Sequence, residues 1–413
     1  MRPESKRGER PRLVVALTFP VHPPLGGGQV RTFNLYRGLA AAFDIELVTL
    51  TSHAAPERHR ELAPGLHEHT IPKSARHMEL ELELERRAGT VVTDIAMAEL
   101  YEHTPAYLEA LREATHGARA AVASHPYTFP AIRAVSDGPV WYEAHNVEAS
   151  LKRTVLGDGE EAQRLLALAE ETERSCCEEA ELVWACSAED RQELIRRYGA
   201  EDERVLVVPN GAAVDDVDYL EPAARQALRE RLRIADRSLA IFIASWHHPN
   251  VLGARRLLRV AEECPEVEFL ILGSVGLALA DDPAPDNVQL PGPVSAGLKQ
   301  SALSVADAAL NSVTTGSGTN LKMLEYFGAG VPVISTSFGA RGLGVRAGEH
   351  FLPAEPAEFP RALRALREMP LSSVERLVRD AHSFVLERLS WSVIAGELLA
   401  ELRARDLRVS PAI

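Results

Sequence analysis

Short apolar runs alternate with helix-length segments along this chain, and the alternation occurs in two successive series. Each run is bounded by polar turns and is short enough to be a strand buried on both faces. The runs of the first series are residues 13–17, 45–50, 120–124, 140–142, 182–186 and 205–208, and those of the second are residues 239–244, 267–272, 288–290, 306–310 and 333–335. Buried strands joined by crossover helices are typical of parallel sheets. Each series therefore predicts one doubly wound α/β domain.

Chain length and the connecting segment agree with this division. At 413 residues the chain is longer than one hydrophobic core usually supports. Residues 208–225, between the two series, contain Pro, Asn and Gly in succession, which favour turns. We expect the first domain to span residues 1–210 and the second to span residues 211–385. Ligands of open α/β sheets bind outside the carboxyl ends of the strands, so we expect two such domains to face each other across a ligand-binding cleft.

One segment of the first domain gives conflicting signals. Residues 77–87, HMELELELERR, alternate Leu and Glu as a half-buried strand would, but both residue types favour helix. The residues that follow, to position 116, are rich in Ala, Leu and Glu, so we expect a helical insertion over residues 76–116. Two interpretations are open for this insertion: a solvated helical hairpin, or a wall of the cleft that selects an acceptor.

Composition and charge exclude several classes of protein. Apolar residues make up 46% of the chain, which excludes wholesale disorder. The formal net charge of −14 would repel a polyanion, so we expect no nucleic-acid partner. No apolar run reaches about 18 residues and residues 1–12 are polar, so we expect a cytoplasmic protein without a signal peptide or membrane-spanning helix. The Arg-rich N-terminal segment still allows peripheral contact with an anionic inner membrane face. The sequence does not indicate the oligomeric state.

Three glycines follow the first predicted strand and precede the first predicted helix; they are Gly26, Gly27 and Gly28. Glycines let the backbone approach a ligand closely, and the free amides at a helix start attract an anion. Arg31, in the first turns of the helix, is predicted to add a charge-assisted bond to a phosphate. The loop lacks the G-x-x-x-x-G-K-[ST] pattern, which excludes a P-loop. We therefore expect an acceptor or phosphate loop here.

Two histidines follow the ends of successive predicted strands, His125 in SHPYTFP and His145 in YEAHNVEAS. Side chains at these positions face the ligand side of an α/β sheet. Histidine is the side chain best suited to exchange protons or hydrogen bonds near neutral pH. Both are candidate site residues.

The most informative segment is GSGTNLKMLEYFGAGVPVIST, residues 316–336. Its first residues supply flexible backbone and capping side chains before a short predicted helix over residues 321–329. The start of such a helix attracts an anion, and Lys322 lies close enough to add charge. Glu325, one turn further along, is placed to accept both hydroxyls of a ribose. A phosphate site next to a ribose site predicts nucleotide binding.

With these motifs in this order, the chain resembles the GT-B glycosyltransferases, specifically the retaining glycosyltransferase family 4. The matching segments are the GGG-x-x-R-x-x-N-L loop, EAHNVEASL, VWACSAEDRQELIRRYG followed by VLVVPNG, GTNLKMLEYFGAGVPVIST and the C-terminal LSWSVIAGEL. The resemblance implies two Rossmann-like domains facing across a cleft, an acceptor half first and a donor half second. It also implies that residues 386–413 form a C-terminal helix that crosses back to the first domain.

The resemblance also implies roles for particular residues. Glu325 matches the glutamate that binds the donor ribose. His125 matches the histidine that contacts the donor sugar near the reacting centre, which makes it the candidate catalytic residue. The second and third glycines of the first loop match those that line the phosphate or acceptor side. The donor diphosphate would face the amides of Thr319, Asn320 and Leu321, and the loop residues Ser317 and Gly318 before them are also expected to bind the donor.

Two departures from the family pattern are present. The family commonly has a second glutamate that contacts the donor sugar, and here that position is Ser317. The Arg and Lys pair that neutralises the diphosphate is also missing after the strand that ends near residue 244, where the chain reads SWHHPNVLGARR. The expected substitutes are Ser245, His247, His248 and Lys322. We expect no metal or other cofactor, and we interpret Asp216-Val217-Asp218 as exposed turn acids instead of a metal-binding D-x-D motif.

The leading hypothesis is a metal-independent, retaining glycosyltransferase that moves a sugar from a nucleoside-diphosphate sugar to a hydroxyl acceptor. The acceptor would be a polysaccharide, a lipid-linked intermediate or a small molecule. One alternative keeps the fold but changes the reaction, to a nucleotide-sugar epimerase or a sugar phosphorylase. Another is a catalytically silent nucleotide-sugar-binding subunit of a transferase complex, which the two departures motivate.

Overall fold

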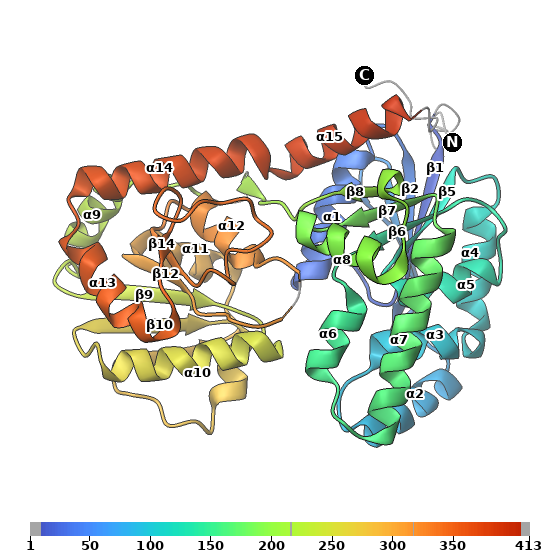
Figure 1. The fold of residues 1–413 in the computed structure, drawn as a ribbon, viewed down its shortest axis with the longest axis horizontal. Helices are drawn as coiled ribbons and strands as arrows, with labels where there is room; N and C mark the ends of the chain where they lie inside the picture. Colours follow the sequence, from blue (N-terminus) through green and yellow to red (C-terminus); the bar gives the residue numbers. More distant parts are fainter. Residues whose placement is uncertain (1–9, 215–216, 317, 406–413) are drawn as a thin grey trace. The chain divides into compact units, whose positions relative to one another are not determined.

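The computed structural model describes residues 10–214, 217–316 and 318–405 (Figure 1). The chain divides into two compact units, one formed by Met1–Pro209 with Ile394–Ile413 and the other by Asn210–Val393. Each unit has its own sheet and its own buried apolar cluster. The predicted α/β class is confirmed in both units.

The strands described in the first unit form one sheet in the order β3-β4-β2-β1-β5-β6-β7-β8. Strand β3 runs antiparallel to β4, and the other neighbouring strands are parallel. The strands are β1 Arg12–Leu17, β2 Asp44–Thr51, β3 Arg58–Ala63, β4 Leu66–Pro72, β5 Ala120–Ser124, β6 Val140–Ala144, β7 Leu182–Ala185 and β8 Val205–Val207. The β3–β4 hairpin was not predicted, because β3 (RHRELA) is a polar edge strand without the apolar run that marks buried strands.

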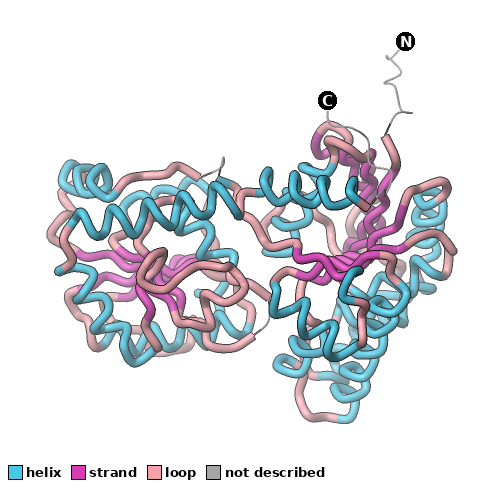
Figure 2. Tube along the Cα trace, turned by 45° about the horizontal axis from the view of Figure 1, so that its top comes forward, coloured by secondary structure: helices cyan, strands magenta, loops and turns pink. Residues whose placement is uncertain are grey.

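Helices lie on both faces of this sheet (Figure 2). They are α1 Gly27–Leu39, α2 Ala75–Ala88, α3 Thr93–Leu100, α4 Pro105–Thr115, α5 Phe129–Arg133, α6 Glu148–Val155, α7 Glu160–Glu179 and α8 Ala188–Tyr198. The ambiguous Leu/Glu segment is helical, within α2. Ser74 caps this helix by accepting a hydrogen bond from the amide of His77, and Gly89 ends it with a φ of 69°.

The strands described in the second unit form a parallel sheet in the order β11-β10-β9-β12-β13-β14. The strands are β9 Ser238–Ile243, β10 Val267–Leu272, β11 Val288–Gly292, β12 Ala308–Asn311, β13 Val333–Ser335 and β14 Leu352–Pro353. The helices are α9 Pro222–Arg231, α10 His248–Glu262, α11 Ala296–Val305, α12 Leu321–Gly328, α13 Phe359–Glu368 and α14 Leu371–Arg388. Strand β14 was not predicted, because two residues are too short for a readable apolar run.

The C-terminal part of the chain forms two helices. Helix α14 ends at Arg388 and α15 (Trp391–Ala404) begins after a short break at which Ser390 forms a bridge with Ala212. The break therefore lies at residues 389–390, later than the expected boundary at 385–386. From Ile394 onward the chain belongs to the first unit, where Arg405 Nη1 donates to the carbonyl of Glu203 at 2.6 Å.

The cysteines Cys176, Cys177, Cys186 and Cys264 are all free and buried. Within the described ranges, we find no helix with both the length and the apolar character needed to cross a membrane.

Candidate functional site

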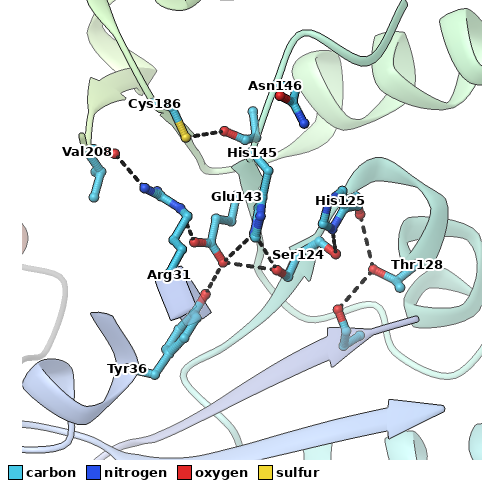
Figure 3. A network of polar contacts seen from close by, with 12 residues as sticks. Arg31, Tyr36, Ser124, His125, Thr128, Glu143, His145, Asn146, Cys186 and Val208 are labelled. Carbon is cyan, nitrogen blue, oxygen red and sulfur yellow. Dashed lines mark hydrogen bonds and ion pairs between the residues drawn. The ribbon is translucent and has the colours of Figure 1, made fainter. Parts of the chain in front are cut away.

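The ends of β5 and β6 bring His125 and His145 together (Figure 3). His125 directly follows β5 and His145 directly follows β6, and the two strands are parallel neighbours. The ring centroids of the two histidines are 4.1 Å apart. The φ of His125 is 76°, a left-handed value that costs a non-glycine residue about 1–3 kcal/mol. Such strain persists only where the surrounding structure imposes it, and it is concentrated at functional sites.

At neutral pH the side chain of His125 can accept a hydrogen bond through Nε2. Its Nδ1 lies 2.9 Å from the carbonyl oxygen of Ser124 and must donate, because a carbonyl only accepts. Burial, together with the neighbouring His145, lowers the pKa of His125 to about 4. The ring is therefore neutral, and the lone pair is on Nε2. This arrangement suits recognition of a hydroxyl group better than general-base catalysis, because a base with such a low pKa binds a proton weakly.

Glu143, near the end of β6, holds this pair of strand ends together. Its carboxylate accepts hydrogen bonds from Arg31 Nε at 2.8 Å, the Tyr36 hydroxyl at 2.8 Å and Ser124 Oγ at 3.1 Å. His145 Nε2 lies 3.0 Å from Ser124 Oγ and 3.5 Å from the same carboxylate. Burial alone would raise the pKa of Glu143, but His145 and Arg31 lower it below its ordinary value. Glu143 is therefore ionised and fully partnered.

The role predicted for Arg31 needs correction. Its guanidinium is buried, pairs with Glu143 and donates to the carbonyls of Val208 at 3.0 Å and Pro209 at 3.2 Å. These internal acceptors hold the side chain, so it supports the strand ends and does not extend toward a phosphate. Glu143 was missed by the sequence reasoning. The predicted strand ended at residue 142, and the observed strand extends to Ala144 and buries Glu143. The available signal was a charged residue directly after an apolar run, because a buried charge requires a partner.

The glycine loop lies beside His145. A Cβ atom at Gly28 would lie 3.2 Å from the Phe19 ring, a tight contact, and 3.5 Å from His145 Nδ1, an ordinary one, so glycine lets α1 begin close to Phe19. Gly27 is the first residue of this helix. The amide of Gly26, the residue before this helix, donates to Gln29 Oε1 at 2.8 Å. The loop therefore packs beside His145, and the Gly26 amide is already partnered within the chain.

In the second unit, the residues before α12 are held by side chains from elsewhere in the unit. Asn210 Nδ2 donates to Thr319 Oγ1 at 2.7 Å. Arg341 Nη2 donates to the carbonyls of Gly318 at 2.8 Å and Gly316 at 3.4 Å. Ser317 lies outside the described residues. Arg341 was not predicted, and no local sequence pattern connects it to this loop.

Lys322 lies in the first turn of α12, as predicted, but its partners are neutral. Its Nζ donates to Asn250 Oδ1 at 2.8 Å and Asn320 Oδ1 at 3.2 Å, and it lies 5.2 Å from the centre of the Phe242 ring. Burial lowers the pKa of Lys322 to about 7. An anion bound beside the ammonium group would favour the protonated form.

Glu325 and Lys299 form an ion pair between α12 and α11. Glu325 lies one turn beyond Leu321 and Lys322, which begin the helix, as the sequence predicted. The side chain of Glu325 is 22% exposed and that of Lys299 is 36% exposed. The pairing with Lys299 was not predicted, because the two residues lie on separate helices and share no motif.

The residues after β9 reach the start of α12 through Asn250. Its Nδ2 donates to the carbonyl and hydroxyl oxygens of Ser245 at 3.1 and 3.3 Å, while its Oδ1 accepts from Lys322. His247 is the residue before α10, and His248 begins that helix. The structure therefore joins Ser245 to Lys322 through an asparagine that the sequence reasoning missed.

Among the residues that the structure describes, no group of three or more His, Cys, Asp or Glu side chains is arranged to hold a metal ion. The D-x-D segment is described only in part, since Asp216 lies outside the described residues. The carbonyl of Asp218 accepts a hydrogen bond from Gln300 Nε2 at 3.2 Å.

In comparisons with known proteins, each of the two units matches a glycosyltransferase family model. Residues 26–211 match the family model for a Glycosyl transferase 4-like domain, and residues 237–368 match the model for Glycosyl transferases group 1. The solved structure of sucrose-phosphate synthase from Thermosynechococcus elongatus covers 95% of this chain and 100% of its own, with a TM-score of 0.74 and 17% identity. The chain belongs to the GT-B glycosyltransferases of the family 4 type. The predicted family and fold are confirmed.

This GT-B glycosyltransferase is also similar to a second solved structure and to a curated glycosyltransferase. Anabaena HepE, solved in complex with UDP and glucose, covers 95% of this chain and 99% of its own, with a TM-score of 0.68 and 14% identity. D-inositol 3-phosphate glycosyltransferase from Geodermatophilus obscurus is 27% identical over 313 residues, which are 66% of this chain. The match spans 64% of that relative's length. At 17% and 14% identity, the two solved structures establish the fold.

Proposed function

We propose that this GT-B glycosyltransferase transfers a sugar from a nucleoside-diphosphate sugar to a hydroxyl acceptor, with retention of configuration and without a metal ion. The observation that carries the proposal is the arrangement on α12. Lys322 lies in its first turn, and Glu325 lies one turn further along. The amides of a helix start and a nearby lysine suit a diphosphate, and an adjacent carboxylate suits the two ribose hydroxyls.

The protonation state of His125 supports the retaining mechanism. With a pKa of about 4, the side chain is a poor base for removing the proton of an acceptor hydroxyl. The proton then passes to an oxygen of the departing diphosphate as the new glycosidic bond forms on the same face of the sugar. His125 Nε2 accepts a hydrogen bond from a substrate hydroxyl and so orients the reacting group. Catalysis is mainly electrostatic, through the helix start and Lys322 acting on the leaving group.

The relatives suggest which substrates to test first. UDP and UDP-glucose are the first donors to test, because the HepE structures are complexes with UDP, glucose and UDP-glucose. An inositol phosphate is one of the first small acceptors to test, alongside glycan and lipid-linked acceptors, because of the name of the curated relative. A cytoplasmic location, at the inner membrane face when the acceptor is lipid-linked, belongs to the same proposal. The free cysteines support a reducing compartment.

Calorimetric titration with UDP, GDP, ADP and their sugar conjugates tests the donor site. The wild-type protein should bind one nucleoside diphosphate, and Glu325→Ala should weaken that binding by about tenfold or more through loss of the ribose contacts. Unchanged nucleotide affinity in Glu325→Ala would refute the assignment of Glu325 to the ribose hydroxyls. No binding of any nucleotide would refute the proposal as a whole.

Product analysis tests the reaction. A retained anomeric configuration in the NMR spectrum of the product, and turnover that persists in EDTA, are the expected results. An inverted product or a strict metal requirement would overturn the corresponding part of the proposal. Two further incubations separate the alternatives. With the donor and no acceptor, interconversion of the donor sugar would indicate an epimerase, and cleavage of a glycoside in the presence of inorganic phosphate would indicate a phosphorylase. Donor binding without transfer or donor hydrolysis would indicate a silent subunit.

A further inference from the structure

The ion pair between Glu325 and Lys299 places a cation directly against the carboxylate that we assign to the donor ribose. Lys299 is the fourth residue of α11, whose start is fixed by Ser295 accepting a hydrogen bond from the Leu298 amide. Neither side chain of the pair is freely exposed, since 36% of Lys299 and 22% of Glu325 are accessible. Both partners project from helices, so the contact is between two rigid elements.

The two lysines near this part of α12 have different partners. Lys322 Nζ is bound by the neutral amide oxygens of Asn250 and Asn320. Lys299 is bound by a carboxylate. The charge of Lys322 is therefore available to an anionic ligand, whereas the charge of Lys299 is already used to neutralise Glu325.

A carboxylate in a ribose subsite creates an electrostatic difficulty for a nucleoside diphosphate. The carboxylate offers the hydrogen-bond acceptors that ribose hydroxyls need, but its negative charge repels the phosphates of the same ligand. A carboxylate has about four acceptor positions on its two oxygens. A lysine that occupies one position on Oε1 leaves Oε2 open for hydroxyl groups and compensates the charge.

We propose that Lys299 is a positioning residue of the donor site: it neutralises Glu325 and fixes its carboxylate so that the ribose of a nucleoside diphosphate binds without repulsion of the phosphates. The inference rests on the proposed function. It adds to that function a residue from a separate helix that acts through Glu325 and does not contact the phosphates. The penalty for removing Lys299 therefore depends on the charge of the ligand and on the presence of the Glu325 carboxylate.

The ligand-charge test compares UDP, UMP and uridine by calorimetry on the full chain. Lys299→Met should weaken UDP binding by about tenfold, UMP binding by less and uridine binding least, because the uncompensated carboxylate repels each added phosphate. Lys299→Arg should restore affinity to within about threefold, because it keeps the charge. Arg364→Met is the matched control, since Arg364 is an exposed cation of the same unit paired with Glu266. It should leave all three affinities unchanged.

A double-mutant cycle tests whether Lys299 acts through Glu325. In a Glu325→Gln background, Lys299→Met should weaken UDP binding by less than about threefold. An equal loss in both backgrounds would show direct phosphate contact and overturn the inference, as would wild-type affinity in Lys299→Met. Far-UV circular dichroism and thermal melting verify folding, and Lys299→Gln provides a second neutral variant. Failure of the wild-type protein to bind any nucleotide would instead refute the proposed function.

Discussion

The lowered pKa of Lys322 predicts that diphosphate binding weakens steeply with rising pH. Burial lowers this pKa from 10.5 to about 7, so the free site loses its positive charge above neutral pH. A bound diphosphate stabilises the ammonium form and raises the pKa, which means that binding takes up a proton. Above pH 7, each pH unit then costs about 1.4 kcal/mol of binding free energy, or about tenfold in affinity. Since the group is half protonated at pH 7, the expected loss between pH 7 and pH 9 is about 50-fold.

Calorimetry with the best-binding nucleoside diphosphate measures this slope. Titrations between pH 7.5 and pH 9.5 avoid protonation of the terminal phosphate, whose pKa is about 6. Buffers of different ionisation enthalpy give the number of protons taken up, which should approach one. Lys322→Arg should bind with little pH dependence, because the guanidinium stays charged. Lys322→Met should bind weakly over the whole range.

Two results would refute this reasoning. One is a wild-type affinity that stays constant between pH 7.5 and pH 9.5. The other is a slope in Lys322→Met equal to that of the wild type, which would assign the titration to another group. In either case Lys322 would not be the cation that responds to the diphosphate.

Three other contacts predict measurable effects. Arg341→Met should weaken nucleoside diphosphate binding by about tenfold in calorimetry, because Arg341 holds the carbonyls that precede α12; unchanged affinity would exclude this role. Glu143→Gln should lower the free energy of unfolding, measured by urea denaturation, by about 3 kcal/mol, because it breaks the buried pair with Arg31. The control Glu57→Gln, at an exposed carboxylate, should change it by less than about 0.5 kcal/mol, and equal effects would contradict the buried pairing. His125→Gly should be about 1 kcal/mol more stable than His125→Ala, since only glycine relieves the φ of 76°, and equal melting temperatures would exclude backbone strain.

Much of the fold was readable because local signals agreed with the tertiary structure. The two series of apolar runs predicted most strands of both sheets, since strands buried on both faces must be apolar throughout. The Leu/Glu segment became α2 because Ser74 caps its start and Gly89 ends it, while His77, Glu81 and Leu84 repeat along its buried face. The β3 strand could not be read in this way, because an edge strand need not be apolar.

The sequence placed the candidate residues along the chain, but it did not reveal their ion-pair partners. The strand ends after β5 and β6 and the start of α12 are local features, so the placement of His125, His145, Lys322 and Glu325 along the chain followed from spacing. Arg31 was assigned to a phosphate because its sequence neighbours give no sign of Glu143, which lies 112 residues away.

The sequence by itself therefore determined the α/β class and the family, and it supplied the candidate site residues as predictions. Only the tertiary structure decided which charges neutralise each other. It paired Arg31 with Glu143 and Lys299 with Glu325, and it gave Lys322 neutral amide partners. The physical reason is that local periodicity indicates whether a segment is buried. An ion pair instead depends on which side chains, distant in the sequence, are buried against each other.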